Sequence, residues 1–201
     1  MAAGASRQHA LLIHPNGSAL HQRARGVGTT SYSFDPANPV PTLGGNVASE
    51  GALMLRGARE QRCQSTDWPC KSILPLSARS DVLEYQTSPL AQDVEVTGRL
   101  IVKLWASSHG PDTDFTAKLV DVYPPSRDYP SGVDLNVGDG IVRARYRDSL
   151  EHPKPLIRGQ LAEFTIEMYP TSLVFRRGHR ICLDISSSNF PRFDVNPKAS
   201  R

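Results

Sequence analysis

Alternating apolar and polar residues near the C-terminal end constrain the fold of this chain more than any other feature. Within residues 178–197, Ile181, Leu183 and Ile185 fall on one side of an extended backbone, and the residues between them fall on the other. A period of two is typical of a β-strand with one buried face. Pro191 then ends the hydrogen-bonded ladder, because proline has no N–H to donate. A strand of this kind needs neighbouring strands on both sides.

The same period recurs in other parts of the chain. The further segments that we predict to be strands are residues 10–14, 82–85, 94–106, 115–123, 141–147, 161–169 and 173–175. Ile101 and Trp105 interrupt the pattern in 94–106, which suggests that the second face of this strand is partly covered. No long window has the apolar spacing of an α-helix. Roughly eight strands joined by loops too long for tight hairpins predict an all-β sandwich of the jelly-roll or immunoglobulin-like kind.

Charge and composition argue against several classes of function. The formal net charge is +3 and the charges are dispersed, whereas a nucleic-acid-binding protein usually concentrates its basic residues in a stripe. No apolar run approaches the length of a membrane span, and the N-terminus lacks the basic region of a secretory signal. We therefore expect no nucleic-acid or membrane partner, and a cytoplasmic location. Residues 1–9 read as a disordered lead, and residues 10–201 read as one domain.

The three cysteines are too few for a disulfide framework. Residues 64–69 separate Cys63 from Cys70 in a loop, so a local bridge and a pair of free thiols are both open readings. Cys182 falls on a predicted strand, where a thiol acts as a small apolar filler.

No residue of this chain is predicted to be catalytic. A nucleophile elbow needs Gly-x-Ser-x-Gly between a strand and a helix, and that sequence does not occur. The serines at 186–188 could be drawn into a triad with Asp184 and His179, but nothing places His179 as a base against them. His179 reads instead as a structural hydrogen-bonding residue. The six histidines have no metal-ligand spacing and no phosphate-binding Gly-rich loop occurs, so we predict no metal and no cofactor.

Two polar clusters are candidates for a structural network. Their members are Asp112, Asp114 and Asp121 in one cluster, and Arg143, Arg145 and Arg147 on one face of the predicted 141–147 strand. The aspartates could bind calcium or, more often, cap a turn. The arginines could bind an acidic partner, or pair with Asp114, Asp121 or Asp128, because a planar guanidinium suits carboxylates. We favour pairing across strands or between domains.

Six motifs in order resemble the C-terminal domain of the cocaine-esterase and X-prolyl dipeptidyl-peptidase-like serine hydrolases. They are YSFDPANPVPTLGG at 32–45, RSDVLEY at 79–85, VEVTG at 94–98, DTDFTAKLVDV at 112–122, GIVRARYR at 140–147, and GHRI continuing to SSSNFP at 178–191. Each motif alone is weak, whereas the ordered series is specific. The resemblance covers about residues 10–197, nearly the whole chain.

The resemblance implies a β jelly roll that packs on an α/β-hydrolase domain and helps to shape its active-site cleft. The Ser, Asp and His of that family's triad belong to the hydrolase domain, and no residue here matches them, so the chain alone is expected to be inactive. The expected role is that of an accessory domain in ester or X-prolyl peptide hydrolysis, and the domain could also form a homodimer. The residues expected to face the cleft or the hydrolase domain are Leu43, Gly44, Gly45, Leu53 and Met54.

Two departures from the family pattern accompany the resemblance. Residues 56–78 contain an insertion with both loop cysteines, and the family pattern continues with further strands where this chain ends at Arg201. We therefore expect a truncated fragment with an open sheet edge. Two alternatives stay open. One is a stand-alone carbohydrate- or protein-binding sandwich, although the sequence shows no row of Trp or Tyr; the other is a fragment without function.

Overall fold

The computed structural model describes residues 29–45, 57–64, 66 and 69–197, and the backbone of 12–13 and 19–20. Within these ranges the chain forms eight strands and two short 3-10 helices, and no α-helix. In chain order they are β1 (Leu12–Ile13), β2 (Ala19–Leu20), η1 (Leu76–Ala78), β3 (Leu83–Gln86), β4 (Val94–Ala106), β5 (Asp114–Tyr123), β6 (Val133–Arg143), η2 (Ala144–Tyr146), β7 (Ala162–Phe175) and β8 (Arg180–Ser186). The lead predicted at 1–9 and the candidate residues Leu53 and Met54 lie outside the described residues.

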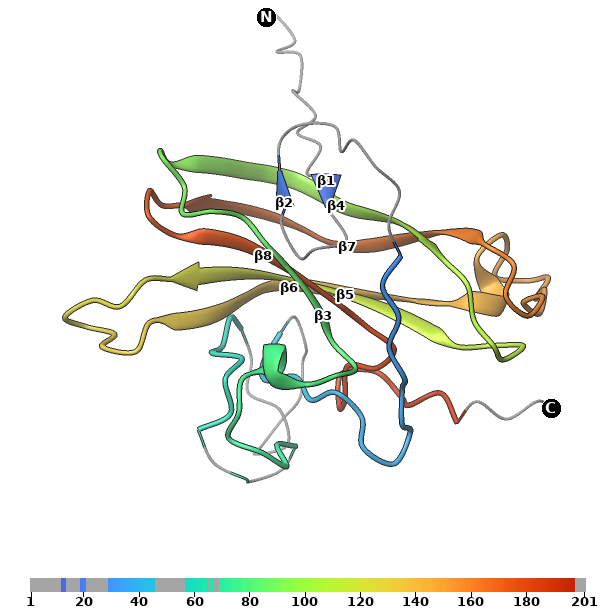
Figure 1. The fold of residues 1–201 in the computed structure, drawn as a ribbon. Coiled ribbons are helices and arrows are strands. Elements are labelled where there is room, and N and C mark those ends of the chain that lie inside the picture. Colours follow the sequence, from blue (N-terminus) through green and yellow to red (C-terminus); the bar gives the residue numbers. More distant parts are fainter. Residues whose placement is uncertain are drawn as a thin grey trace, which may run out of the picture.

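Two antiparallel sheets pack face to face, which confirms the predicted all-β sandwich (Figure 1). The larger sheet has the strand order β3-β8-β5-β6, and the second sheet pairs β4 with β7. The β4–β7 sheet lies on one side of the larger sheet, and residues 57–64 and 69–82 lie on the other side. A separate two-stranded ribbon joins β1 to β2.

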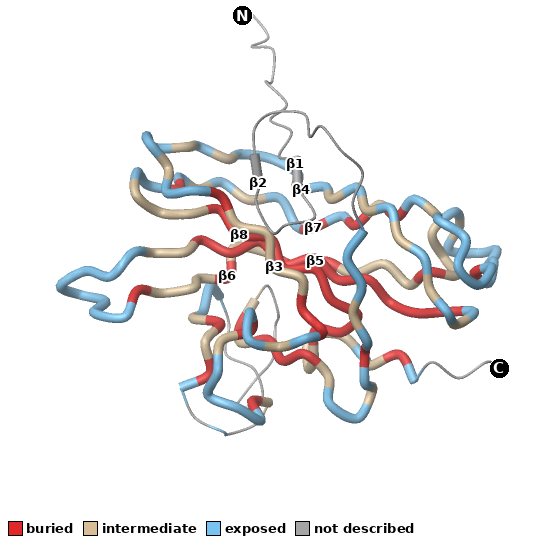
Figure 2. Tube along the Cα trace, viewed as in Figure 1, coloured by how far each residue is buried: buried red, intermediate tan, exposed pale blue. Residues whose placement is uncertain are grey.

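The apolar core fills the space between the two sheets. Its largest contributors are Phe115, Ala117 and Leu119 of β5, Ile181, Leu183 and Ile185 of β8, and Phe164, Ile166, Met168 and Phe175 of β7. The rings of Phe115 and Phe164 meet with their centroids 4.7 Å apart. Burial of a large apolar side chain contributes about 1.5–3 kcal/mol, so this layer is the main source of stability. The buried positions run along the centre of the molecule in Figure 2.

The opposite face of the larger sheet is polar, and it is buried as well. Thr116 and Lys118 of β5 and Asp184 and Ser186 of β8 are all less than 10% exposed, at 3%, 4%, 8% and 5%. Residues 29–45, 57–64 and 69–82 cover this face, so a polar layer lies between the sheet and these covering segments. The central strand β5 is therefore enclosed on both sides.

The prediction of a single strand over residues 141–147 was wrong. β6 runs from Val133 to Arg143, and η2 follows it at once. The backbone leaves the ladder because the N–H of Ala144 donates to the Thr113 carbonyl at 2.9 Å, and the N–H of Arg145 donates to Asp112 at 3.0 Å. The three arginines consequently do not share one strand face. The strands predicted at 161–169 and 173–175 are one strand, β7, which runs from Ala162 to Phe175.

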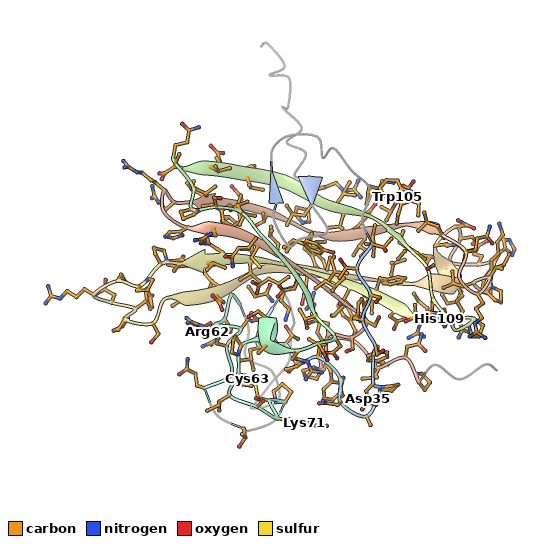
Figure 3. All side chains as sticks on the ribbon, in the orientation of Figure 1. Asp35, Arg62, Cys63, Lys71, Trp105 and His109 are labelled. Carbon is orange, nitrogen blue, oxygen red and sulfur yellow. A yellow bond between two sulfur atoms is a disulfide. The ribbon has the colours of Figure 1, made fainter. Side chains whose placement is uncertain are left out.

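The outer face of the β4–β7 sheet is exposed, which differs from the expected partial cover. Ile101 is 51% exposed and Trp105 is 58% exposed. Figure 3 shows Trp105 on this outer layer, away from the polar layer below the larger sheet. Cross-strand ion pairs stand between these apolar side chains, with Lys103 contacting Glu163 at 2.7 Å.

Candidate functional site

The Gly44–Gly45 turn is the described part of the surface expected to face a hydrolase domain. The two glycines have φ angles of +67° and +117°, a region that residues with a Cβ rarely adopt. A Cβ on Gly44 would lie 2.4 Å from the Gly57 carbonyl oxygen and 2.4 Å from Cγ of Arg59. Gly45 and Gly57 exchange two backbone hydrogen bonds, of 2.8 and 3.1 Å. The turn therefore has a fixed backbone that only glycine fits.

Gln61 holds the strand-like segment that leads into this turn. Its Nε2 donates to the carbonyls of Leu43 at 2.7 Å and Arg59 at 3.0 Å. Its Oε1 accepts from Thr42 Oγ1 at 3.2 Å and from Lys118 Nζ at 2.8 Å. Gln61 is only 4% exposed, so these contacts replace its hydration. Leu43 and Gly45 are half-buried at the edge of the segment.

Two predicted arginines pair with two predicted aspartates. Arg143 donates to both carboxylate oxygens of Asp114, at 2.9 and 3.1 Å, and Arg145 Nε donates to Asp112 at 2.7 Å. The amide of Asn196 donates to both aspartates, at 3.2 and 3.0 Å. Asp112 and Asp114 are 5% and 1% exposed. Because N–H donors already surround these carboxylates, the arrangement suits a structural anchor better than calcium binding.

The other members of the predicted network lie elsewhere. Arg147 donates to the carbonyls of Ala144 at 3.0 Å and Lys154 at 2.7 Å. Asp121 contacts His179 Nδ1 at 2.9 Å, at the far end of β5. Burial raises the pKa of Asp121, and the contact with His179 opposes that rise. Asp128, the third carboxylate considered as a partner, is exposed.

The serines that follow β8 bond to the covering segment and to their own strand. Ser187 Oγ lies 2.8 Å from the Tyr32 hydroxyl, and Ser188 Oγ accepts the N–H of Val40 at 2.8 Å. His179 precedes β8, whereas these serines follow its last residue. At about 3.3 Å per residue the separation is on the order of 25 Å. Ser187 and Ser188 therefore form no triad with His179.

Lys118 is the most deeply placed cation of the polar layer. Its ammonium contacts Gln61 Oε1 at 2.8 Å and the Pro41 carbonyl at 3.4 Å. Burial lowers the pKa of Lys118 to about 8, and the charges of Asp184 and Asp139 oppose this shift. Asp139 is itself engaged by the Asn189 amide, at 2.7 Å. The layer is a connected network of charged and amide groups.

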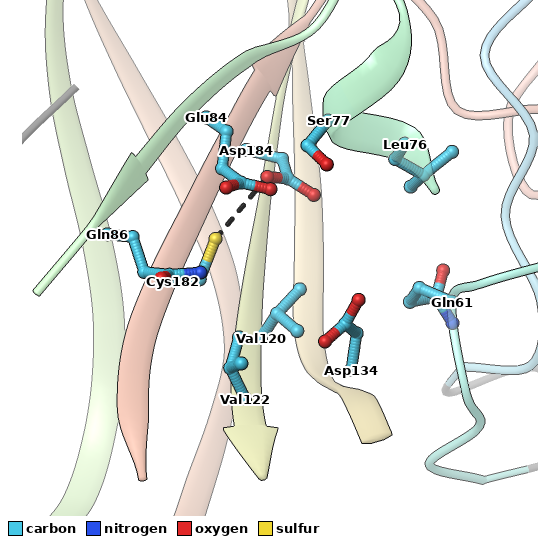
Figure 4. Close-up of a pocket in the computed structure, with 10 residues that line it drawn as sticks. All are labelled: Gln61, Leu76, Ser77, Glu84, Gln86, Val120, Val122, Asp134, Cys182 and Asp184. Carbon is cyan, nitrogen blue, oxygen red and sulfur yellow. Dashed lines mark hydrogen bonds between the residues drawn. The ribbon is translucent and has the colours of Figure 1, made fainter. Parts of the chain in front are cut away.

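A cavity opens at the edge of the polar layer, between β3, β8 and the covering segment (Figure 4). It is lined by Gln61, Leu76, Ser77, Glu84, Gln86, Val120, Val122, Asp134, Cys182 and Asp184. The ligand atoms of Glu84, Cys182 and Asp184 all lie within 4.8 Å of one another. Burial raises the pKa of Glu84 to about 7 and that of Asp184 to about 6. Burial also raises the pKa of the Cys182 thiol.

The three groups of this cluster are better suited to holding protons than to binding a metal ion. A thiol binds a metal as the thiolate, and burial among carboxylates opposes deprotonation of Cys182. The raised pKa values of Glu84 and Asp184 likewise favour the neutral acids. Cys182 is a free thiol only 1% exposed, in agreement with the predicted small buried filler, and it lies beside Asp184 on the face of β8 that lines the cavity.

Of the two readings left open for the loop cysteines, the structure has the disulfide between Cys63 and Cys70. Both are buried, at 6% and 5% exposure, and Figure 3 shows Cys63 in the segment below the larger sheet. Arg62 anchors the same segment, since it donates to the Ser131 carbonyl at 2.8 Å and to Glu60 at 2.9 Å. The loop is thus attached to the turn between β5 and β6.

The polar layer and the cavity were not predicted from the sequence. In residues 115–119, Thr116 and Lys118 alternate with apolar residues, a pattern that normally indicates a solvent-facing side. The only signal of burial is the long, proline-rich segment that precedes the strands, because such a segment needs a surface on which to pack. No local pattern identifies Glu84 and Asp184 as neighbours.

The fold and the paired polar network define a β-sandwich domain made of two antiparallel sheets. The family model for the X-Pro dipeptidyl-peptidase C-terminal non-catalytic domain matches residues 8–201. The cocaine esterase of Rhodococcus sp. (strain MB1 Bresler) is 43% identical over 166 residues, which are 83% of this chain and 25% of the esterase. The chain belongs to the family of X-Pro dipeptidyl-peptidase C-terminal non-catalytic domains.

Solved structures agree with this assignment. An aminopeptidase from the marine sediment archaeon Thaumarchaeota archaeon superposes with a TM-score of 0.76 at 29% identity, covering 95% of this chain and 31% of that protein. An α-amino acid ester hydrolase superposes with a TM-score of 0.75 at 30% identity, covering 95% of this chain and 30% of the hydrolase. The chain thus spans less than a third of each of these relatives. Among the described residues, no helix has the length and apolar character needed to cross a membrane.

Proposed function

We propose that this chain is the accessory domain of an ester- or peptide-cleaving serine hydrolase, where it walls the substrate cleft and stabilises the catalytic domain. The observation that carries the proposal is the match of residues 8–201 to a non-catalytic C-terminal domain. The 25% coverage of the cocaine esterase supports it, because most of that relative's chain lies outside the matched region. The partner of this chain would be an α/β-hydrolase domain that carries the triad.

The Gly44–Gly45 turn is the part of the surface that we assign to the cleft. Irregular backbone at a loop commonly carries the residues that line pockets. Here Gln61 and Gly57 hold that backbone with hydrogen bonds of 2.7–3.1 Å. A fixed turn can present Leu43 and Gly45 to a partner without losing entropy on contact. Leu43 is the side chain that we expect to contact the hydrolase domain.

Complementation tests the proposal. The catalytic part of the Rhodococcus esterase, expressed without the region that matches this chain, is mixed with the chain, and hydrolysis of a chromogenic aryl ester is measured. We expect binding and a gain in esterase activity over the catalytic part alone. Absence of both binding and restored activity would count against the proposal.

A matched pair of variants tests the assigned surface. Leu43→Asp introduces a charge beside the Gly44–Gly45 turn, and should weaken the restored activity. Leu150→Asp introduces the same charge at a residue that is 85% exposed on another loop, and should leave the restored activity unchanged. Circular dichroism of both variants confirms that they fold. Equal effects of the two variants on the restored activity would show that Leu43 does not contact the hydrolase domain.

A further inference from the structure

Glu84 and Asp184 are direct cross-strand neighbours that carry the same charge when ionised. β3 pairs with β8 in an antiparallel register that sets Glu84 opposite Asp184. Both side chains line the cavity in Figure 4, and their carboxyl oxygens lie within 4.8 Å of each other. Like charges placed directly opposite on two strands destabilise the pairing. The contact between β3 and β8 therefore depends on the protonation of these two groups.

Lys118 supplies positive charge to one member of this pair, Asp184, whereas the charges that act on Glu84 are the negative ones of Asp184 and Asp134. Cys182 of β8 donates its S–H to Asp184 at 3.5 Å, and Asp134 of β6 adds a third carboxyl on the far wall. The charged and polar groups around the pair are Lys118 from β5, Arg62 and Gln61 from the covering segment, Ser77 from η1 and Arg180 further along β8. Lys118 bonds to Gln61, Arg62 contacts Glu60 and Asp134, and Arg180 donates to the Thr87 carbonyl.

β3 is a short strand at one edge of the larger sheet. It has four residues, Leu83–Gln86, and it lies at the sheet edge, where β8 is its single neighbour. Two of these residues, Glu84 and Gln86, form a wall of the cavity. Movement of β3 away from β8 would open the cavity, and it would also take Leu83 and Tyr85 away from the edge of the apolar core.

We propose that Glu84 and Asp184 together bind at least one proton in the folded chain, and that its loss loosens β3 from β8 and opens the cavity. The geometry gives the direction of the effect. Burial raises the pKa of Glu84 from 4.5 to about 7 and that of Asp184 from 3.8 to about 6. The folded state therefore holds more protons than the unfolded state between about pH 4 and pH 7. The contribution of the pair to stability is largest below the ordinary pKa values, declines as pH rises through 6 to 7, and stays low above that range.

Thermal unfolding of the chain at pH 5 and pH 8 tests the proton linkage. Glu84→Gln removes the charge and keeps the shape, so we expect its Tm to exceed the native Tm by about 3 °C at pH 8 and by much less at pH 5. Glu95→Gln is the matched control on the exposed face of β4, and should shift Tm equally at both pH values. Equal shifts for Glu84→Gln at the two pH values, or no gain at pH 8, would overturn the proposal.

Amide hydrogen exchange of the native chain separates movement of β3 from unfolding of the whole domain. After correction for the intrinsic pH dependence of exchange, residues 83–86 should open at least tenfold more often at pH 8 than at pH 5, while residues 162–175 of β7 should not. Glu84→Gln should remove that difference. A pH dependence of opening that is the same in β3 and β7, or absent from β3, contradicts the proposal.

Discussion

The side-chain oxygen of Gln61 accepts a hydrogen bond of 2.8 Å from the ammonium of Lys118, a residue 57 positions away in the sequence. Gln61 belongs to the segment that covers the larger sheet, and Lys118 belongs to the central strand β5. This contact therefore ties the cover to the sheet at a point from which water is excluded. It also connects the Gly44–Gly45 turn to the polar layer, because the same amide bonds to Leu43.

Gln61→Ala should lower the free energy of unfolding by about 2–3 kcal/mol, because it leaves the buried Lys118 ammonium and the Leu43 carbonyl without their partner. Urea unfolding followed by circular dichroism measures the change. The control is Gln160→Ala at an exposed loop position, where we expect a change within about 0.5 kcal/mol. If the free energy of unfolding fell as little for Gln61→Ala as for the control, water would be taking the place of the Gln61 amide at Lys118 and Leu43.

Arg143→Met should cost about 2–3 kcal/mol, because Asp114 is 1% exposed and would keep a buried charge without its guanidinium. Lys103→Met breaks an ion pair of similar length, 2.7 Å to Glu163, but both side chains of that pair are about half exposed. We expect its cost to stay below about 1 kcal/mol. Chemical denaturation of the two variants, measured side by side, checks the ranking, and the reverse order would refute it.

Gly44→Ala and Gly159→Ala separate backbone strain from steric conflict. The φ angles are alike, +67° and +72°, but a Cβ on Gly159 meets nothing within 4 Å, whereas one on Gly44 would lie 2.4 Å from Gly57 O. The left-handed backbone alone costs about 1 kcal/mol. We expect about 1 kcal/mol for Gly159→Ala and about 2–4 kcal/mol for Gly44→Ala. Thermal unfolding measures both values. Equal losses of stability in the two variants would mean that the Gly57 backbone shifts readily to admit the added Cβ.

Asn136→Leu should stabilise the chain by about 1–2 kcal/mol. Asn136 is 2% exposed, and neither atom of its amide has a hydrogen-bond partner among the described residues. An unpaired buried amide is costly, and leucine has the same branched arrangement of four side-chain heavy atoms. Asn189→Leu is the matched comparison at 3% exposure, and should destabilise because it removes the 2.7 Å bond to Asp139. Destabilisation by both changes, measured by urea unfolding, would show that Asn136 has a partner in solution.

Strands whose alternate residues are apolar could be predicted from the sequence. β4 and β5 were found within one residue of their observed ends, and β8 was found from its alternation at 181–185 although it ends at Ser186, before Pro191, because one face of each strand lies against the apolar core. Most of β6 was missed, since VDLNVGDG at 133–140 reads as a polar loop. Residues 59–61 pair with the edge of β6, as the bond from the Gln61 N–H to the Asp134 carbonyl at 2.8 Å shows. The Asp134 side chain lines the cavity together with Gln61. The alternation of polar and apolar residues alone does not show whether the polar face of a strand is buried or exposed to solvent.

The ordered motifs predicted the family, because they depend on short runs of sequence. The cavity could not be predicted, because it joins Gln61, Glu84 and Asp184 from three distant parts of the chain. Arg143 and Asp114 could be proposed as a pair from their charges, and the structure sets them opposite each other in the β5–β6 register. The turn at η2 depends on the contact of Asp112 with the Arg145 N–H, and no local pattern reveals that contact.

The two faces of β5 also decide how this domain can be redesigned. On the apolar face, residues such as Leu119 can be exchanged for others of similar volume at a cost below about 1.5 kcal/mol, because dispersion contacts have no fixed direction. On the other face, Thr116 and Lys118 bond to named partners with defined geometry. A library that varies β5 should therefore change the first set of positions singly, and the second set only together with the residues that they bind.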